Sequence, residues 1–245
     1  MGVGAVGIGS GWMGDEQLLE ILAADVVECR ACPRLVDWRE RVGREKTARF
    51  ADQVYWGRPV PGFGDARARV LILGLAPAAH GGNRTGRIFT GDRSGDFLFA
   101  SMYRAGFANQ PISIARGDGL VLSGAYVSAV NRCAPPGNRP TPGERDRCLP
   151  YLEREVTALS ELRVVIALGS FAWDGALRAT AGLGHTVRPR PRFTSARTVT
   201  TACRCRNRMS IRATSASGSG TYGPKCWCES SVATPPNWSR NHATC

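Results

Sequence analysis

Two cysteines stand at a spacing that a metal ion or a metal cluster can use. Cys29 and Cys32 are separated by two residues, and Pro33 follows them. Cys133 and Cys148 lie far along the chain, on either side of a proline-rich stretch. Thiolates grouped in this way bind zinc or iron–sulfur clusters. Taken alone, the spacing leaves zinc, a cluster and free thiols open, and it disfavours a thioredoxin-like redox pair because no strand–helix–strand unit precedes it.

A second group of polar residues follows a short apolar run. Residues 70–73 are wholly apolar and partly β-branched, which predicts a strand buried on both faces. The next polar stretch, 80–92, offers an imidazole, an amide, two guanidiniums and a carboxylate among four glycines. Ligands of open α/β sheets bind beyond the carboxyl ends of strands, so we predict an active site here. An ordinary strand-to-helix connection is the alternative.

The order of the elements predicts an α/β fold. Helices are expected over 15–25, 95–106, 144–159 and after a capping Ser170, and buried strands over 70–73, 125–131 and 162–169. Strand, turn and helix thus recur three times. This recurrence predicts a three-layer sandwich with a central parallel sheet flanked by helices.

The first strand and its loop resemble a known family. The motif residues are Gly74-Leu75-Ala76-Pro77-Ala78, His80-Gly81, Asn83-Arg84-Thr85-Gly86-Arg87 and Phe89-Thr90-Gly91-Asp92. They resemble the first motif of the family 5 (type B) uracil-DNA glycosylases, an iron–sulfur group, and the resemblance covers about residues 15–193. It implies a uracil-DNA glycosylase-like fold and a DNA-repair enzyme. Such an enzyme flips a deaminated base out of DNA and hydrolyses its N-glycosidic bond, which initiates base excision repair.

The resemblance also implies a cofactor. Cys29, Cys32, Cys133 and Cys148 have the order and approximate spacing by which the family holds a [4Fe–4S] cluster. We expect this cluster to be structural and to pin the N-terminal segment against the loop after the second strand. Spacing by itself does not exclude zinc, which also suits four thiolates.

The resemblance assigns substrate-binding roles to five residues. Gly74, Ala76 and Ala78 are expected to line the substrate pocket. Phe89 is expected to stack on the flipped base, with packing in the core as the alternative. Asn131, at the end of the second strand, is expected to read uracil, because an amide donates and accepts hydrogen bonds at once.

Catalytic roles fall on the later part of the loop. The family often places an acid or amide early in this motif, but residues 75–78 contain neither. Asp92 and Asn83 are therefore the candidates to hold or activate water, with Asp92 alternatively the acid at a helix N-terminus. His80 is expected to support the leaving uracil or to contact phosphate, or only to stabilise the loop.

The chain is strongly basic, with 245 residues and a formal net charge of +12. This charge suits a polyanion, although it does not by itself distinguish DNA from RNA or anionic lipid. The resemblance implies uracil-containing DNA, double or single stranded, as the partner of a monomer in the bacterial cytoplasm at the nucleoid. No run is long enough to span a membrane. Two other functions stay open: a non-catalytic DNA-binding iron–sulfur protein, and a hydrolase of nucleotides or small phosphorylated substrates.

The two ends differ from the middle of the chain. Residues 1–14 are glycine-rich without a charged start, which predicts a disordered extension rather than a signal peptide. Residues 194–245 are a basic tail rich in Ser, Thr, Arg and Cys, in which the resemblance stops. The family's later strand, its His-Pro-Ser-type motif and its closing helix do not appear there. We interpret this tail as the product of a shifted reading frame or as a natural disordered tail, and we expect its lack of the histidine motif to impair activity.

Overall fold

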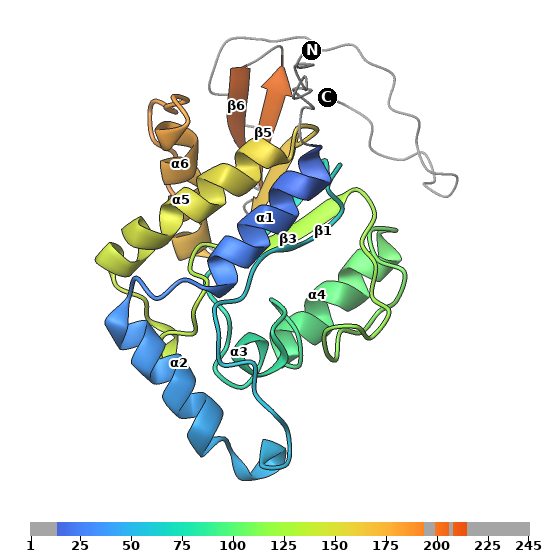
Figure 1. The fold of residues 1–245 in the computed structure, drawn as a ribbon. Helices are drawn as coiled ribbons and strands as arrows, with labels where there is room; N and C mark the ends of the chain where they lie inside the picture. The colour runs from blue at the N-terminus through green and yellow to red at the C-terminus, as the bar shows by residue number, and fades with distance from the viewer. Residues whose placement is uncertain (1–13, 194–198, 206–207, 215–245) are drawn as a thin grey trace, which may run out of the picture.

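The structure is a computed structural model that describes residues 14–193, 199–205 and 208–214, the last two ranges by their backbone alone. Its main elements surround one sheet (Figure 1). The helices are α1 (Asp15–Val27), α2 (Pro33–Glu45), α3 (Gly82–Thr85), α4 (Arg93–Arg104), α5 (Pro142–Ala158) and α6 (Ser170–Gly182). The strands are β1 (Phe63–Gly64), β2 (Val70–Gly74), β3 (Ala125–Ala129), β4 (Val164–Ala167), β5 (Val199–Cys205) and β6 (Arg208–Thr214), and two 3-10 turns lie at Ala48–Phe50 and Pro136–Asn138.

The central sheet has the strand order β1-β3-β2-β4. Strand β2 pairs in parallel with both β3 and β4, so that Val70 stands opposite Ala125 on one side and Val164 on the other. These are the three strands predicted from sequence, and their parallel pairing is confirmed. Strand β1 adds an antiparallel edge beside β3, which makes the whole sheet mixed. Two residues, one of them glycine, carry no periodicity by which sequence reasoning recognises a strand.

Helices cover both faces of this sheet, as the predicted three-layer sandwich requires (Figure 1). Side chains alternate along a strand, so Leu71 and Leu73 face one way and Ile72 the other. The first two pack into a core with residues of α1, α5 and α6. Ile72 packs into a second core with Phe99 and Met102 of α4. The carboxyl ends of β2 and β3 emerge between these two layers.

Two helix starts show how the chain positions its polar residues. Helix α5 begins with a capping box, in which the Thr141 hydroxyl accepts from the Glu144 N–H and the Glu144 carboxylate accepts from the Thr141 N–H. Helix α6 differs from expectation, because its N-cap is Gly169 and Ser170 is already helical. Gly169 has φ 106°, a conformation that favours glycine, and it therefore makes the sharp turn out of β4.

The ends of the chain are described only in part. Apart from Gly14, the predicted extension 1–14 lies outside the described residues, and so do 194–198, 206–207 and 215–245 of the predicted tail. Within that tail, β5 and β6 pair as an antiparallel hairpin. Sequence reasoning expected no regular element there.

Candidate functional site

The fold brings the four distant cysteines into one pocket, here called the cysteine pocket. Cys29 follows α1, and Cys32 is the N-cap of α2. Cys133 comes shortly after β3, while Cys148 lies within α5. All four line the same pocket, and all four are free thiols. The predicted set is therefore assembled in space from three separate parts of the fold.

Nitrogen donors surround the sulfur atoms. The Arg39 Nη1 donates to Cys133 Sγ at 2.9 Å, and Arg147 Nε donates to Cys32 Sγ at 3.3 Å. The backbone N–H of Arg132 donates to Cys148 Sγ at 3.3 Å. Hydrogen bonds of this kind stabilise negative charge on a thiolate and tune a metal that the thiolate binds.

The two inner thiols are held in their neutral form by burial. Burial raises the pKa of Cys133 to about 11, although the Arg39 guanidinium opposes the shift. Burial likewise raises the pKa of Cys148 to about 12 against the opposing charge of Arg132. Because metal ligation requires thiolates, a metal or cluster entering the pocket must displace these protons.

The donor set of the cysteine pocket fits an anionic cluster. Arg39 and Arg132 are each 1% exposed and line the pocket, and their Nε atoms have no hydrogen-bond partner among the described residues. Leaving a buried donor without an acceptor destabilises the fold by about 1–3 kcal/mol, so hydrogen-bond acceptors bound in the pocket would be favourable. The sulfides of an iron–sulfur cluster are such acceptors. In the described part of the chain, no three Cys, His, Asp or Glu residues are grouped closely enough to hold one metal ion.

A groove lies at the carboxyl-end edge of the sheet. Of the predicted site residues, Ala78, His80 and Asp92 line it, whereas Gly74, Ala76, Asn83, Phe89 and Asn131 are not among its lining residues. The lining comprises Arg49, Phe50, Gln53, Ala78, Ala79, His80, Gly81, Arg84, Gly91, Asp92, Arg93, Asp96, Ser113, Ile114 and Asn138. Three arginines among these residues give the groove the charge that attracts phosphate groups.

Asp92 both caps helix α4 and lines the groove. Its Oδ1 accepts from the Gly95 N–H at 3.0 Å, so the carboxylate caps α4. Its Oδ2 lies against Gly81, where a side-chain carbon would collide with that oxygen. One oxygen is thus used by the helix, and the residue still lines the groove.

His80 is oriented by a partner that sequence reasoning missed. The Tyr55 hydroxyl lies 3.0 Å from His80 Nδ1, and the two rings meet edge to face. When the phenol donates this hydrogen bond, the imidazole proton sits on Nε2 and His80 is a neutral donor. Tyr55 is buried in a segment that is otherwise polar and basic, and nothing in its sequence neighbourhood marks this pairing.

Phe89 takes a backbone conformation that non-glycine residues rarely adopt. Its φ is 52°, in the left-handed region. The ring lies against Gly74, where a Cβ would come within 2.6 Å of Phe89 Cζ. The Phe89 carbonyl lies directly against Gly95, which leaves no room for a side chain there. Gly74 and Phe89 are therefore in contact at the end of β2, and half-buried Ala76 lies between Gly74 and the groove residue Ala78 in sequence.

The two predicted amides are both fully buried. Both side-chain atoms of Asn131 lack a hydrogen-bond partner among the described residues, and its backbone N–H donates to the Leu75 carbonyl at 3.0 Å. Asn83 is turned toward α2, where its Nδ2 donates to the Arg39 carbonyl at 3.2 Å, and its Oδ1 lacks a partner among the same residues. Asn131 thus adjoins the motif, and Asn83 joins the loop to the cysteine pocket.

A buried ion pair braces the motif loop. Arg87 Nη2 donates to Asp118 Oδ2 at 2.6 Å and to Ser113 Oγ at 2.7 Å, and Arg87 Nε donates to Thr90 Oγ1 at 3.1 Å. Burial tends to raise the pKa of Asp118, but the Arg87 guanidinium and three backbone N–H groups hold it well below its usual range. The partners are far apart in sequence, so no local signal reveals them.

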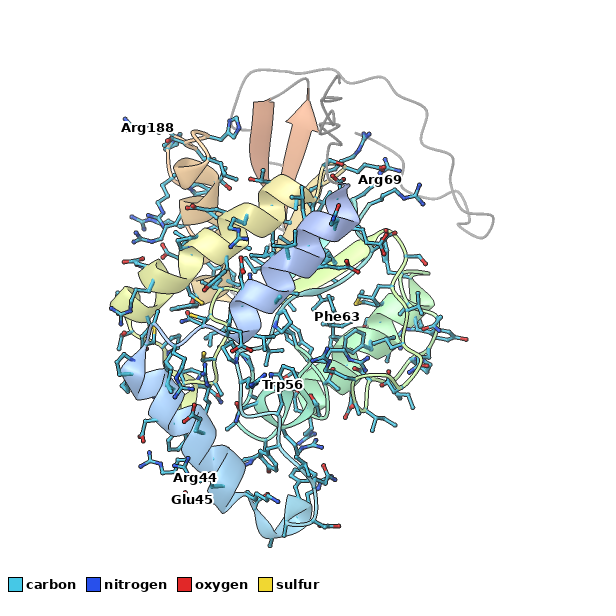
Figure 2. The ribbon with its side chains drawn as sticks, in the orientation of Figure 1. Arg44, Glu45, Trp56, Phe63, Arg69 and Arg188 are labelled. Atoms are coloured by element: carbon cyan, nitrogen blue, oxygen red, sulfur yellow. The ribbon has the colours of Figure 1, made fainter. Side chains whose placement is uncertain are left out.

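Positive charge is not confined to the groove. Arg44 stands at the end of α2, whereas Arg69 and Arg188 lie at the opposite end of the molecule (Figure 2). Within the groove, the Arg84 guanidinium lies 3.9 Å from the centre of the Phe50 ring. Net charge alone therefore does not locate the site.

Comparison with known proteins shows to which family the chain belongs. A family model described as the uracil DNA glycosylase superfamily matches residues 61–216, more than half of the chain. The chain belongs to this superfamily. It is 57% identical over 173 residues to the Type-5 uracil-DNA glycosylase of Mycobacterium tuberculosis, with 70% of this chain and 63% of that protein covered. It is 51% identical over 170 residues to the Type-5 uracil-DNA glycosylase of Thermus thermophilus, with 69% and 76% covered.

More distant relatives include a Type-4 uracil-DNA glycosylase of Pyrobaculum aerophilum, which is 35% identical over 116 residues and covers 47% of this chain and 51% of its own. The chain spans 63% of the length of the mycobacterial Type-5 protein that it matches. The resemblance inferred from the motif residues is confirmed. The superfamily match also runs past Phe193 into the β5–β6 hairpin.

Proposed function

We propose that this chain removes uracil from DNA by hydrolysing its N-glycosidic bond, the step that initiates base excision repair. The buried amide of Asn131 is the observation that carries the proposal. Both of its polar atoms lack partners among the described residues, at the sheet edge where Phe89 lies against Gly74. An extruded uracil offers a carbonyl and an imide N–H to such an amide and a flat face to the ring.

Each remaining polar residue has a role in the proposed reaction. Glycosidic cleavage passes through an oxocarbenium-like centre while the base departs as an anion. Asp92 holds the attacking water at the groove, and the unpartnered Oδ1 of Asn83 is a second acceptor for water. His80, oriented by Tyr55, donates to the leaving base or to a phosphate. Arg49, Arg84 and Arg93 bind backbone phosphates along the groove.

We propose that Cys29, Cys32, Cys133 and Cys148 hold a [4Fe–4S] cluster. The four thiols in one pocket and the unpaired Nε donors of Arg39 and Arg132 support this assignment. Such a cluster supplies structural cross-linking and takes no part in the glycosidic step. Arg39, Arg132 and Arg147 would stabilise the thiolates that bind it, since they already donate to three of the sulfur atoms.

The proposed partner is uracil-containing DNA, double or single stranded, bound by a monomer. The groove arginines and the net charge of +12 support a polyanionic partner. Residence at the bacterial nucleoid is part of the same proposal. In the described part of the chain, no helix has the length and apolar character needed to cross a bilayer.

One assay tests the proposed activity against both alternatives. The full chain, purified without oxygen, is incubated with a duplex that contains one uracil and with a matched duplex that contains thymine. The proposal expects free uracil and alkali-labile sites from the first duplex only. Binding of both duplexes without base release would indicate a non-catalytic DNA-binding protein. Turnover of nucleotides without action on either duplex would indicate a small-substrate hydrolase.

We further propose that residues 194–245 limit the rate, because they contain no His-Pro-Ser-type motif. Removing one preorganised stabiliser of developing charge costs about 3–4 kcal/mol, or a few hundredfold in rate. A chimera that joins residues 1–193 to the C-terminal segment of a family member should turn over faster than the chain as given. Equal rates would show that the motif is dispensable. Sequencing the coding DNA around the Phe193 codon tests the shifted frame directly.

A further inference from the structure

Phe89 keeps a backbone conformation that its residue type does not favour. At φ 52° a phenylalanine is strained, and such a conformation persists only where the surrounding contacts fix it. The residues on either side, Ile88 and Thr90, are 1% and 0% exposed, whereas Phe89 itself is half-buried. The chain around the ring is therefore fixed inside the fold, while the ring stays partly accessible.

Arg87 joins the two sides of the turn that carries Phe89. Its Nε donates to Thr90 Oγ1 at 3.1 Å, so the guanidinium links a residue before the ring to the residue directly after it. Its Nη2 donates to Asp118 Oδ2 at 2.6 Å and to Ser113 Oγ at 2.7 Å. Because Arg87 is buried, its guanidinium holds the loop and does not reach DNA phosphates.

Asp118 fixes the segment 113–120, which packs against this turn. Its Oδ2 accepts from the Ile114 N–H at 2.8 Å, and its Oδ1 accepts from the Leu120 N–H at 3.1 Å. The same Oδ2 pairs with Arg87. One carboxylate therefore folds its own segment and holds the guanidinium of the motif loop. An asparagine of the same shape would keep only part of these contacts, because an amide offers one oxygen instead of two.

The Phe89 ring meets the end of β2 without an intervening side chain. A Cβ on Gly74 would come within 2.6 Å of Phe89 Cζ, so the ring is packed against backbone. Asn131 adjoins the same end of the strand, since its N–H donates to the Leu75 carbonyl at 3.0 Å. A displacement of the turn would move the ring relative to the amide that is proposed to read uracil. Such a displacement would slow the reaction, because catalysis depends on geometry at the ångström scale.

We propose that Arg87, Thr90 and Asp118, here called the Phe89 clamp, position the ring for stacking on the extruded base. This inference rests on the proposed function, because the base must leave the duplex to reach the ring. The three residues are not among those that line the groove, so they are positioning residues that act through Phe89. The clamp holds the ring in place before DNA binds, which keeps small the entropy lost when the base stacks on it.

A double-mutant cycle tests whether the clamp acts through the ring. Single-turnover rates of uracil release are measured for the full chain, Asp118→Asn, Phe89→Ala and the double variant, at a temperature at which circular dichroism shows all four folded. Each single variant should be about tenfold slower, and the double variant no slower than Phe89→Ala, because a missing ring cannot be misplaced. Losses that multiply to about a hundredfold, or an unchanged rate in Asp118→Asn, would overturn the proposal.

A second pair of variants changes the clamp without leaving a buried charge unpaired. Thr90→Val removes the hydroxyl that accepts from Arg87 and keeps the shape of the side chain, whereas Thr90→Ser keeps the hydroxyl. Thr90→Val should slow uracil release and Thr90→Ser should not; the reverse order, or equal rates, would reject the clamp. Asp174→Asn is the matched control, since this carboxylate accepts from buried Arg145 at 2.7 Å but does not line the groove. It should leave the rate unchanged, and a loss like that of Asp118→Asn would assign both effects to stability.

A third measurement is independent of uracil release. The full chain carries para-fluorophenylalanine at position 89 alone, and fluorine NMR without DNA reports the surroundings of that ring. The parent should show one narrow resonance, which Asp118→Asn and Thr90→Val should shift or broaden and Asp174→Asn should leave in place. An identical resonance in all four proteins would reject the clamp even in a chain that releases no uracil. Failure of uracil release in a parent chain whose resonance responds as expected would instead reject the proposed function.

Discussion

The cysteine pocket and the groove are built on different principles. The pocket depends on residue identity, since four sulfur atoms and the arginines that donate to them must be those residue types. The motif loop that contributes residues to the groove depends on backbone shape, since Phe89 in that loop takes a left-handed conformation against glycines at 74 and 95. The first kind of site is visible in a sequence as spacing. The second becomes visible only when the chain is folded.

The two sites also respond differently to change. A conservative replacement in the pocket removes a proposed ligand outright, whereas in the groove the side chains of Asp92 and His80 are each held by a hydrogen bond to another residue. Asn83 joins them, because its Nδ2 donates to the carbonyl of Arg39, and Arg39 donates to Cys133. Substitutions in the cysteine pocket should therefore perturb the groove more than substitutions in the groove perturb the pocket. The following substitutions test this asymmetry.

The largest effect is expected from Cys133→Ser. The change removes one proposed cluster ligand and leaves Arg39 buried beside a weaker acceptor. We expect loss of the brown colour, of about four irons per chain, and of soluble protein. Iron analysis and visible absorption of protein purified without oxygen measure this. Cys245→Ser, outside the described residues, is the control, and a colourless parent with stoichiometric zinc would contradict the cluster.

Asp118→Asn should give the next largest effect. It leaves Arg87 buried without its charged partner, which costs about 3 kcal/mol. Because the pKa of Asp118 is held well below its usual range, its contribution is complete above about pH 4, the unfolded value, and is lost as the pH falls further. Urea midpoints of parent and variant should therefore differ most near pH 7 and converge in acid. A constant difference at all pH values would assign the loss to packing.

Phe89→Ala should act on catalysis more than on stability. Base–aromatic stacking is worth about 1–3 kcal/mol per base, so uracil release should fall about tenfold or more. Affinity for uracil-free duplex and its salt dependence should not change, because phosphate contacts supply them. Gly74→Ala is the matched test from the other side, since its Cβ would displace the ring. Parallel loss of base release and of DNA affinity in both variants would point to misfolding.

Asp25→Asn should have the smallest effect. It breaks the ion pair with Arg154 at 2.7 Å, in which both side chains are about half exposed. Exposed pairs contribute about 0–1 kcal/mol, so the urea midpoint should scarcely move. The comparison with Asp118→Asn then separates burial from mere pairing. A large loss here would show that the contact between α1 and α5 matters more than its exposure indicates.

The features that were predicted correctly from the sequence follow from residue type and from the periodicity of apolar residues. The apolar runs predicted β2, β3 and β4, and the family resemblance predicted the set of four cysteines that lines the pocket. Asp92 at the start of α4 was also anticipated, because an acid before an amphipathic run is a common cap. These features are local, or they rest on residue types with few other uses.

What sequence reasoning missed depends on contacts between distant segments. Tyr55 against His80, and Asp118 against Arg87, join residues with no spacing rule between them. The left-handed φ of Phe89 was hidden because the residue is not glycine. The turn of Asn83 toward α2 was missed for a similar reason, since an amide in a polar loop gives no sign of its partner.

The pairing of Arg34 with Glu144 bears on the order in which the chain folds. Both guanidinium nitrogens of this pair lie 2.7 Å from carboxylate oxygens, and they join α2 to the start of α5 across about a hundred residues of chain. Bringing together segments so far apart costs chain entropy that rises only slowly with loop length, and this ion pair helps to offset that cost. Because the ion pair needs no metal, the apo-chain can bring the two halves of the cysteine pocket together before any iron arrives. The proposed cluster would then bind to a pocket in which the four cysteines are already close together.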